Sequence, residues 1–411
     1  MKKSLIALAA LAAVSGVAQA QSSVTVYGLI DAGYATSDIN HGAGVETNQK
    51  VVGGLHSANG TGTLSGSRLG FRGTEDLGGG LKANFVLETG INYSNGEAAT
   101  TTPSSATAGF ANGSMFANVR QGWAGLSGGF GDLRIGTHNS LAKDNSESID
   151  PNSGVTLTGY FYQQGLAVTR PANSITYLSP RMSGLQFQAQ VDEGESTTSA
   201  TVPKDNSGLS FALSYAVDKF TATAWTEERK NQSYVGSSAN RLVSLSSGSV
   251  VMPIAAGSAA STSITYNPTL TVTTSTTTTT TDATANVIDK VTQTGFGATY
   301  DFGFAKVAAM STKLKYKDST AADNGEIAST LLGVDVPVNA KVRVRASVST
   351  GKITDEGVKT YDLDGHQLVA MYELSKRSHL YAAFGQVKYD SPSADSDVKI
   401  KQMGVGMRTT F

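Results

Sequence analysis

The closing segment of the chain alternates between two kinds of residue with a period of two. Over residues 399–411, one face of the expected strand is mainly apolar and ends on an aromatic: Met403, Val405, Met407, Thr409 and Phe411. The opposite face carries polar residues and glycines: Gln402, Gly404, Gly406, Arg408 and Thr410. A long strand with this pattern suits a membrane barrel wall, where one face meets lipid and the other meets water. An edge strand of a soluble β-sandwich would show the same pattern.

Two further segments alternate basic and apolar residues. In residues 341–349 the odd positions are polar, namely Lys341, Arg343, Arg345, Ser347 and Ser349. In residues 313–317 three lysines share one face. A charge that faces hydrocarbon at the membrane midplane costs about 2–4 kcal/mol, so we expect both basic rows to face water inside a barrel. A soluble amphipathic strand with a solvated face remains the alternative for each segment.

The number and spacing of such segments favour the barrel. Sixteen strands are expected near residues 24–35, 65–74, 80–93, 115–127, 130–137, 172–179, 184–192, 207–217, 219–230, 288–302, 302–317, 327–336, 340–351, 363–376, 378–389 and 398–411. Seven short connections strictly alternate with eight long ones, which lie at 36–64, 94–114, 139–168, 193–206, 231–287, 318–326, 352–362 and 390–397. A strict alternation of short and long loops is not typical of a β-sandwich. The sequence therefore predicts an all-β, 16-stranded antiparallel transmembrane β-barrel with short periplasmic turns, long extracellular loops and both termini in the periplasm.

The first residues have the pattern of a secretory signal peptide. A basic start is followed by an apolar run over Leu5–Val17 and by the small-x-small sequence Ala18-Gln19-Ala20. We expect residues 1–20 to be a signal peptide and residues 21–411 to form the mature barrel domain. The apolar run is too short for a retained membrane helix, and no later stretch approaches that length. Any membrane crossing must therefore be by barrel.

The composition agrees with a barrel that has a polar lumen. Only 39% of residues are hydrophobic and 45 are glycine, which is a low hydrophobic fraction for a soluble protein with a large core. The chain has no cysteine, and a barrel ring without free edges closes a secreted fold without disulfides. The 32 basic and 33 acidic residues become 30 and 33 without Lys2 and Lys3, a mature net charge of −3. This balance gives no support for a nucleic-acid partner.

The connection 231–287 contains a low-complexity tract, Thr269–Thr281, with six consecutive threonines from Thr276. We interpret it as an extracellular surface loop, and composition does not decide whether it is extended or mobile. The tract motivates an alternative function, in which the barrel serves mainly in adhesion or surface binding through this loop.

Several segments, taken in order, carry a family resemblance. They are residues 23–33 (SVTVYGLIDAG), 67–82 (SRLGFRGTEDLGGGLK), 120–131 (RQGWAGLSGGFG), 173–180 (NSITYLSP), 372–377 (YELSKR) and the terminal Phe411. Together they resemble a trimeric Gram-negative general porin of the neisserial and betaproteobacterial type, over the whole mature chain. Two features depart from that pattern: Thr137-His138 stands where a basic residue is frequent, and Thr409-Thr410 replaces a His-containing ending.

The resemblance implies a function and partners. It implies an outer-membrane, water-filled channel for passive diffusion of small hydrophilic solutes and ions, with no cofactor. It further implies a homotrimer in contact with outer-membrane lipid. Phe411 would be the signal that the outer-membrane assembly machinery recognises.

The resemblance also implies a pore constriction. Such porins fold the third loop, here 139–168, into the lumen and set acidic loop groups against basic wall groups, which creates a transverse field. The wall positions that match, with two plausible neighbours, are Arg68, Arg120, Arg170, Arg134 and Lys82. The only carboxylates in the loop are Asp144, Glu147 and Asp150. With the basic rows, these residues predict mild anion selectivity.

The parity of each strand agrees with this assignment. Arg68 and Arg72 lie on the face opposite Leu69 and Phe71, and Arg134 lies opposite Leu133 and Ile135. Arg120 is expected on the same face as Gly122 and Ala124, with Trp123 on the other face.

An outer-membrane hydrolase is the enzyme alternative, and it finds little support. The five histidines are His41, His56, His138, His366 and His379, and only His138 has a serine nearby, Ser140. No His or Cys spacing suggests a transition metal, and Asp323-Asn-Gly-Glu326 lacks the further ligands of a calcium loop. We therefore expect neither an enzyme nor a metal site.

Overall fold

The strands of the protein follow the expected order along the chain. The computed structural model describes residues 23–40, 46–53, 64–91, 119–153, 170–193, 207–234, 286–317, 325–355, 358–390 and 397–411. Within these ranges the strands are β1 (Ser23–Asn40), β2 (Glu46–Gly53), β3 (Arg68–Gly78), β4 (Leu81–Gly90), β5 (Val119–Gly128), β6 (Gly131–Thr137), β7 (Ser174–Leu178), β8 (Leu185–Asp192), β9 (Gly208–Val217), β10 (Phe220–Tyr234), β11 (Asn286–Asp301), β12 (Lys306–Lys317), β13 (Gly325–Pro337), β14 (Val342–Asp355), β15 (Val358–Glu373), β16 (Ser378–Asp390) and β17 (Val398–Thr410). The helix α2 (Leu141–Ile149) lies between β6 and β7.

Three of the sequence predictions fall outside these ranges. They are the signal peptide at 1–20, the threonine-rich tract within 231–287 and residues 154–169 of the third loop. They stay predictions.

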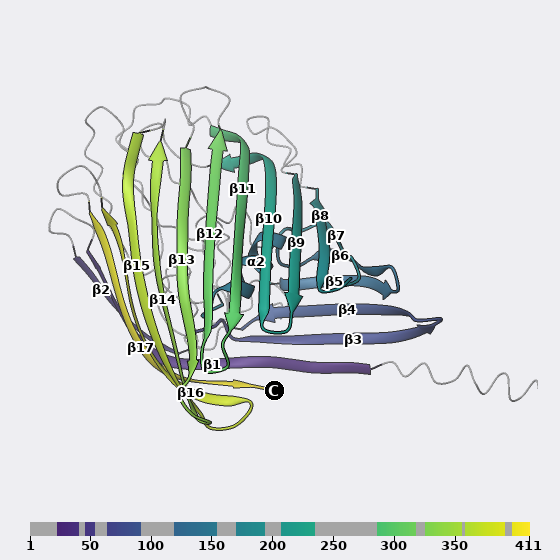
Figure 1. Cartoon of the computed structure of the whole chain (residues 1–411), viewed down its shortest axis with the longest axis horizontal. Helices are drawn as coiled ribbons and strands as arrows, with labels where there is room; N and C mark the ends of the chain where they lie inside the picture. Colours follow the sequence, from purple (N-terminus) through teal and green to yellow (C-terminus); the bar gives the residue numbers. More distant parts are fainter. Residues whose placement is uncertain are drawn as a thin grey trace, which may run out of the picture.

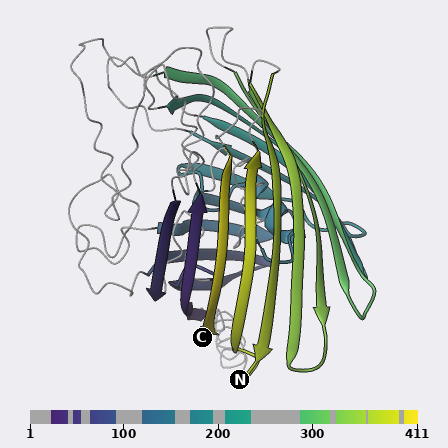
Figure 2. The same ribbon diagram turned by 90° about the vertical axis from the view of Figure 1, so that its left-hand side faces the viewer.

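Sixteen of the strands form a closed antiparallel wall (Figures 1 and 2). From β3 to β17 each strand pairs with its neighbours in the sequence. The first strand closes the ring, because Ser23–Leu29 pairs with β3 while Leu29–Asn40 pairs with β17. A closed ring leaves no edge with unpaired backbone groups, which is the condition for spanning a membrane with strands. The predicted 16-stranded antiparallel barrel is confirmed.

The first long connection contains a seventeenth strand that the sequence did not predict. β2 pairs with Gly33–Asn40 of β1, which is the part of β1 that no longer contacts β3. Its first five residues, Glu46–Lys50, are all polar. A strand without alternation leaves no period-two signal, so this segment was assigned to the loop 36–64.

The terminal strand has the predicted faces. On its outer face, Met403 and Val405 are 57% and 56% exposed. The backbone of Phe411 exchanges two hydrogen bonds of 3.2 Å with Gly28 of β1. A Cβ atom at Gly28 would lie 2.3 Å from the Phe411 ring, so the glycine is what lets the ring lie against β1. The aromatic terminus is thereby held at the seam where the barrel closes.

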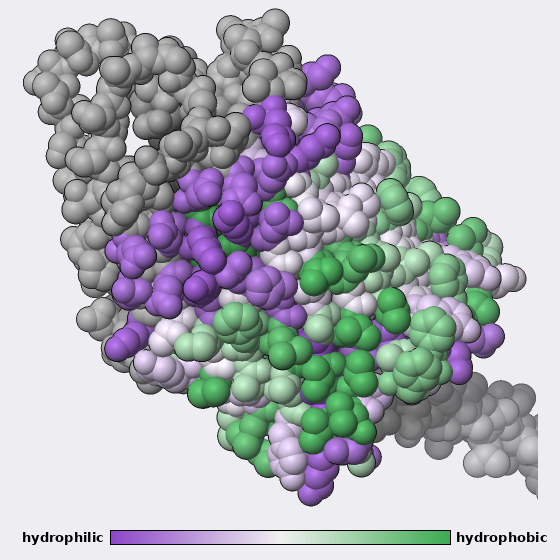
Figure 3. Space-filling view, turned by 60° about the vertical axis from the view of Figure 1, so that its left-hand side comes forward, coloured by the Kyte–Doolittle hydropathy of each residue, from purple (hydrophilic) through white to green (hydrophobic). Residues whose placement is uncertain are grey.

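The two basic rows point in opposite directions, and one prediction is wrong. Arg343 and Arg345 face the lumen as expected and line a cavity inside the barrel. Lys313 and Lys315 instead lie on the outer face of β12, where their partner Glu326 also lies. The inner face at the same level is apolar, since Leu314 and Tyr316 are buried there among other inward residues. On the outer surface a polar region lies above an apolar one (Figure 3). Because the exposed lysines of β12 need water and Leu314 and Tyr316 are buried on the inner side, we interpret this end of the strand as lying above the apolar band.

Within the described part of the chain, the only helix is far too short to cross a membrane.

Candidate pore constriction

The third loop enters the barrel as a helix. α2 begins after Ser140, whose hydroxyl accepts a hydrogen bond of 3.2 Å from the backbone N–H of Lys143 and so caps the first turn. Its apolar residues Leu141, Ala142 and Ile149 are buried against the inner face of β9 to β13, with Trp225 and Leu331 among the wall residues. The helix therefore lies inside the wall, behind β10 and β11 in Figure 1. The helix was not predicted from the sequence, where this segment is part of the third loop.

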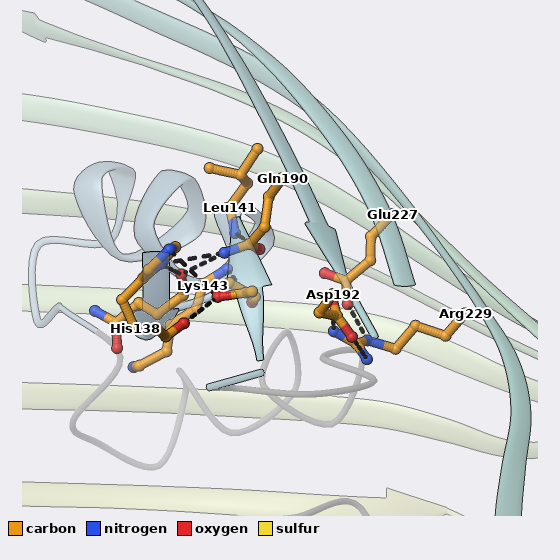
Figure 4. A network of polar contacts seen from close by, with 11 residues as sticks. His138, Leu141, Lys143, Gln190, Asp192, Glu227 and Arg229 are labelled. Atoms are coloured by element: carbon orange, nitrogen blue, oxygen red, sulfur yellow. Dashed lines mark hydrogen bonds and ion pairs between the residues drawn. The ribbon is translucent and has the colours of Figure 1, made fainter. Parts of the chain in front are cut away.

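Polar contacts fix the helix against the wall (Figure 4). The Asn145 amide donates a 3.0 Å hydrogen bond to Gln188 of β8, and the Thr223 hydroxyl of β10 donates to the Asn145 carbonyl oxygen. The backbone N–H of Leu141 donates to Gln190 at 3.3 Å. All of these groups are buried, where a hydrogen bond is costly to leave unmade.

Two glycines on the inner wall make room for the loop. A Cβ atom at Gly297 of β11 would lie 3.0 Å from Ile149, and one at Gly333 of β13 would lie 2.6 Å from Pro151. Just beyond Pro151, the Asn152 amide donates a 3.1 Å hydrogen bond to Ser347 of β14. The loop thus contacts the inner wall closely at β11, β13 and β14.

The wall formed by β1 and β3 to β5 carries a basic cluster organised around one carboxylate. Glu88 of β4 accepts a 2.8 Å hydrogen bond from the Arg120 guanidinium and lies 3.8 Å from that of Arg68. The Tyr27 hydroxyl donates to the same carboxylate at 3.0 Å. Glu88 was not among the residues predicted from the sequence, although it lies on the same face of β4 as Lys82, which was predicted to line the lumen.

Arg170 joins this cluster from the chain segment before β7. It lines the same cavity as Arg68 and Arg120. Burial, and then the neighbouring Arg120 guanidinium, lower the pKa of Arg170 to about 10. Its Nε atom is buried without a hydrogen-bond partner in the described part of the chain. Arg68 and Arg120 thus share Glu88, while Arg170 interacts electrostatically with both Glu147 and Glu88. With Lys143 beside Glu147, four basic groups face two carboxylates, which leaves a local excess of positive charge.

A β-bulge, rather than simple alternation, turns Arg120 inward. The pairing of β4 with β5 runs from Glu88 opposite Gln121 to Thr89 opposite Val119, which skips Arg120. Trp123 therefore lies on the lumen side, under the Arg134 guanidinium at 4.7 Å from the ring centroid. The expected lumen orientation of Arg120 is correct, but the expected placement of Trp123 on the opposite face is wrong. A bulge reverses the parity of every residue beyond it.

A cavity of about 970 Å³ lies between the basic cluster, the loop and the opposite wall. The loop contributes Lys143 and Glu147, and the opposite wall contributes Arg343, Arg345 and Arg408. Altogether nine Lys or Arg residues and three Glu residues line it. The passage is therefore strongly basic.

Of the predicted loop carboxylates, only Glu147 lines the cavity. It forms an ion pair with Lys143 one helical turn earlier. Burial lowers the pKa of Lys143, and the Glu147 carboxylate opposes that shift. Asp144 instead accepts a 2.7 Å hydrogen bond from Asn139. Asp150 is buried and accepts from the Asn152 backbone at 2.9 Å, which shapes the turn after the helix.

Two of the predicted wall residues lie outside the cavity. Arg134 forms an ion pair of 2.8 Å with Asp132 on the same strand. Lys82 is the second residue of β4, next to the short turn. Their charges are farther along the wall than those of Arg68, Arg120 and Arg170.

Two acidic residues behind the loop, Asp192 and Glu227, are buried and do not line the passage. Arg229 of β10 forms paired 2.9 Å hydrogen bonds with Asp192 and a 2.6 Å bond with Glu227 (Figure 4). All three side chains are at most 4% exposed. Among the described residues no cluster of His, Cys, Asp or Glu could hold a metal ion.

A closed antiparallel barrel with an apolar outer band, a loop folded inside and a narrow charged passage is the architecture of outer-membrane channels. A model of the Gram-negative porin family matches residues 7–257 and 233–392. The chain belongs to this family, as the sequence resemblance indicated. It is therefore a porin of the Gram-negative outer membrane, a channel for small hydrophilic solutes and ions and not an enzyme.

Individual relatives agree with this assignment. Outer membrane porin protein 32 of Delftia acidovorans is 30% identical over 399 residues, which cover 94% of this chain and 90% of the relative. The solved anion-selective porin from Comamonas acidovorans shares the fold with a TM-score of 0.66 and 22% identity, over 95% of this chain and all of that one. A trimer form of OmpT from Vibrio cholerae has a TM-score of 0.58 and 13% identity, over 95% of this chain and 99% of that one.

Proposed function

We propose that this porin prefers anions, and that Arg68, Arg120 and Arg170 on the wall with Glu147 on the loop form its selective ring. The proposal depends on the charge imbalance of the cavity, where nine basic residues face three carboxylates. In a narrow passage with low-dielectric walls, uncompensated positive charge concentrates anions and repels cations. The anion-selective porin from Comamonas acidovorans, which has the same fold, supports this preference.

The remaining predicted residues have smaller parts in this proposal. Arg134 and Lys82 lie outside the cavity, and Asp144 and Asp150 make hydrogen bonds within the loop. We expect substitutions at these four positions to change ion preference less than substitutions in the ring.

Planar-bilayer recording in a salt gradient tests the ring. The variant R68Q/R120Q/R170Q is expected to move the reversal potential toward cations. Because that variant leaves Glu88 without its basic partners, R68Q/R120Q/R170Q/E88Q serves as a second form with the same three charges removed. R134Q removes one charge elsewhere on the wall and should shift the potential less than R120Q, the single ring substitution with which it is compared. Wild-type reversal potentials in both ring variants would overturn the proposal.

We also propose that the protein is a homotrimer, as its family resemblance implies and as the trimer form of OmpT supports. Light scattering of the detergent-solubilised protein is expected to give three times the monomer mass. A mass of one chain would contradict the proposal.

Phe411 is proposed as the signal for the outer-membrane assembly machinery. Its deletion should reduce the amount of assembled barrel in the membrane more than it changes the conductance of the channels that do form. Normal yield of the truncated chain would contradict this role. F411A distinguishes the contribution of the aromatic ring from that of the backbone, since it keeps the two backbone hydrogen bonds to Gly28.

A further inference from the structure

Three polar side chains lie in one row on the inner wall of β9 to β11. Glu227 of β10 is directly opposite both Ser210 of β9 and Gln293 of β11. All three residues are on the inward face and are at most 1% exposed. Residues directly opposite each other on one face of an antiparallel sheet have Cβ atoms about 5 Å apart, so these side chains share one small space. We call this group of three residues the β10 site.

Each side chain of the β10 site has polar atoms without a hydrogen-bond partner in the described part of the chain. These atoms are the Ser210 hydroxyl oxygen, Oε2 of Glu227, and both Oε1 and Nε2 of Gln293. Trp225 lies two residues before Glu227 on the same face, and its indole N–H is also buried without a partner. Buried polar groups are nearly always hydrogen-bonded, because an unpaired one is costly. Four such residues side by side therefore point to a bound species.

The neighbouring arginine compensates only part of the charge at this site. Arg229 reaches across Gly208 to Asp192, and a Cβ atom at Gly208 would lie 3.0 Å from the guanidinium carbon. The two Nη atoms donate to the two oxygens of Asp192, and only Nε donates to Glu227, at Oε1 (Figure 4). One guanidinium group between two carboxylates leaves a net charge of about −1 in a buried place. A buried charge without a counter-charge is strongly unfavourable.

We propose that the β10 site binds a hydrated monovalent cation, sodium or potassium. Its protein ligands would be Oε2 of Glu227, the Ser210 hydroxyl and Oε1 of Gln293, since carboxylate, hydroxyl and amide oxygens are suitable ligands for hard cations. A water molecule bound to the cation would accept hydrogen bonds from the Trp225 indole and the Gln293 amide. The single positive charge of the ion matches the excess charge of the two carboxylates.

Two other occupants fit the β10 site less well. Calcium takes about 6–8 oxygen ligands, often from several carboxylates, whereas Arg229 already binds both oxygens of Asp192. A divalent ion would also leave a buried excess of positive charge. A water molecule alone would satisfy the hydrogen bonds but would leave the charge of Glu227 uncompensated.

The position of the site gives the ion a structural role. Trp225 belongs to the apolar cluster that holds α2 against the wall. Its indole lies across Gly295, where a Cβ atom would overlap the ring. An ion whose bound water accepts from the indole N–H would therefore stabilise the wall at the place where the third loop packs.

Anomalous diffraction from crystals soaked in thallium(I) acetate tests the site, because Tl⁺ replaces sodium and potassium and scatters strongly. E227Q removes the charged ligand, while Q293L removes the amide ligand and keeps the acidic groups with Arg229. E228Q is the matched control, since it removes the next carboxylate of β10, which is 39% exposed and lies 2.7 Å from Lys290. A conducting channel from each variant in a planar bilayer shows that its barrel is folded.

Thermal unfolding in neutral detergent gives a second measurement. The unfolding midpoint of the purified protein is compared in sodium chloride and in choline chloride at the same concentration. An ion that binds only the folded state raises the midpoint, and choline is too large for the site.

The wild type and E228Q are expected to show a thallium peak at the β10 site. Their midpoints should be higher by about 1–3 °C in sodium chloride than in choline chloride. E227Q and Q293L should lose both the peak and the sodium dependence. The proposal is overturned if the wild type shows no peak at the site, or if E227Q keeps the peak, as an adventitious ion would. It is equally overturned if the wild-type midpoint is the same in both salts, as expected for water alone or for a protonated Glu227.

Discussion

β12 and β14 carry the same alternation of basic and apolar residues, yet they direct it to opposite sides of the wall. In β14 the basic residues lie near the periplasmic end, where Arg343 and Arg345 face the lumen and bind Asp335 at 2.9 and 3.2 Å. In β12 they lie near the extracellular end, where Lys313 and Lys315 face outward. Alternation therefore shows which residues share a face, but the height along the barrel decides which face is wet.

The strand between these two offers the strongest test of the comparison. Leu332 of β13 faces outward, is 54% exposed, and pairs with Ala309 of β12 and Val348 of β14. L332R is expected to destabilise the barrel by about 2–4 kcal/mol, because it places a charge in the apolar band. Urea unfolding in lipid vesicles measures the effect. V338R, at the exposed periplasmic turn, should lower the free energy of unfolding by at most about 1 kcal/mol. An equal decrease in both variants would show that the position along the barrel axis does not decide whether the outer face meets lipid or water.

The second test neutralises each basic row in turn. R343Q/R345Q leaves Asp335 uncompensated beside the passage, so the ratio of anion to cation permeability should fall several-fold. K313Q/K315Q, on the outer face, should leave that ratio unchanged. Reversal potentials in a salt gradient measure both variants. A shift of equal size in the lysine variant would indicate that Lys313 and Lys315 face the lumen, which would contradict the outward orientation.

Glu88 allows a smaller change within the passage. E88Q removes the carboxylate shared by Arg68 and Arg120, and it keeps a group that accepts a hydrogen bond from Tyr27. The positive excess should rise and anion preference should increase by about twofold, a modest effect because one charge changes among many. A reversal potential that moved toward cations would contradict the arrangement of this cluster.

His138, a buried group next to the loop helix, provides the smallest effect. It is 4% exposed, and burial lowers the pKa of its imidazole below the usual value. The unfolded chain therefore takes up a proton first as the pH falls. The stability of the wild type should decrease from about pH 7 toward pH 5.

H138Q removes this titration and should flatten the pH dependence of unfolding over the same interval, without a change of ion preference. A wild-type profile that is as flat as that of H138Q would show that folding leaves the pKa of His138 unchanged, which would contradict its burial as the cause.

The fold was largely predictable because each wall strand buries or exposes alternate residues over many positions. The misassigned lysines show the limit of a short window. Over residues 313–317 the pattern alone does not choose a side, but the outer residues Val307 and Ala309 continue into the same face as Lys313. Extending the alternation along the whole strand would have placed the lysines outside.

The constriction was less predictable, because it depends on contacts between distant segments. Arg68 and Glu88 lie on the paired strands β3 and β4, but Arg170 comes from the segment before β7 and joins them only in the folded barrel. The inward orientation of Arg120 depends on a bulge that no pattern in β5 reveals. Similarly, the burial of α2 is determined by the facing wall and by the space left at Gly297 and Gly333.

A single-channel recording of the wild-type protein in a planar bilayer, under a tenfold gradient of potassium chloride, tests the central claim most directly. The basic passage predicts discrete conductance steps and a reversal potential with the sign of chloride preference. The variant R68Q/R120Q/R170Q should move that potential toward the potassium value. A wild-type reversal potential with the sign of potassium preference would contradict the account.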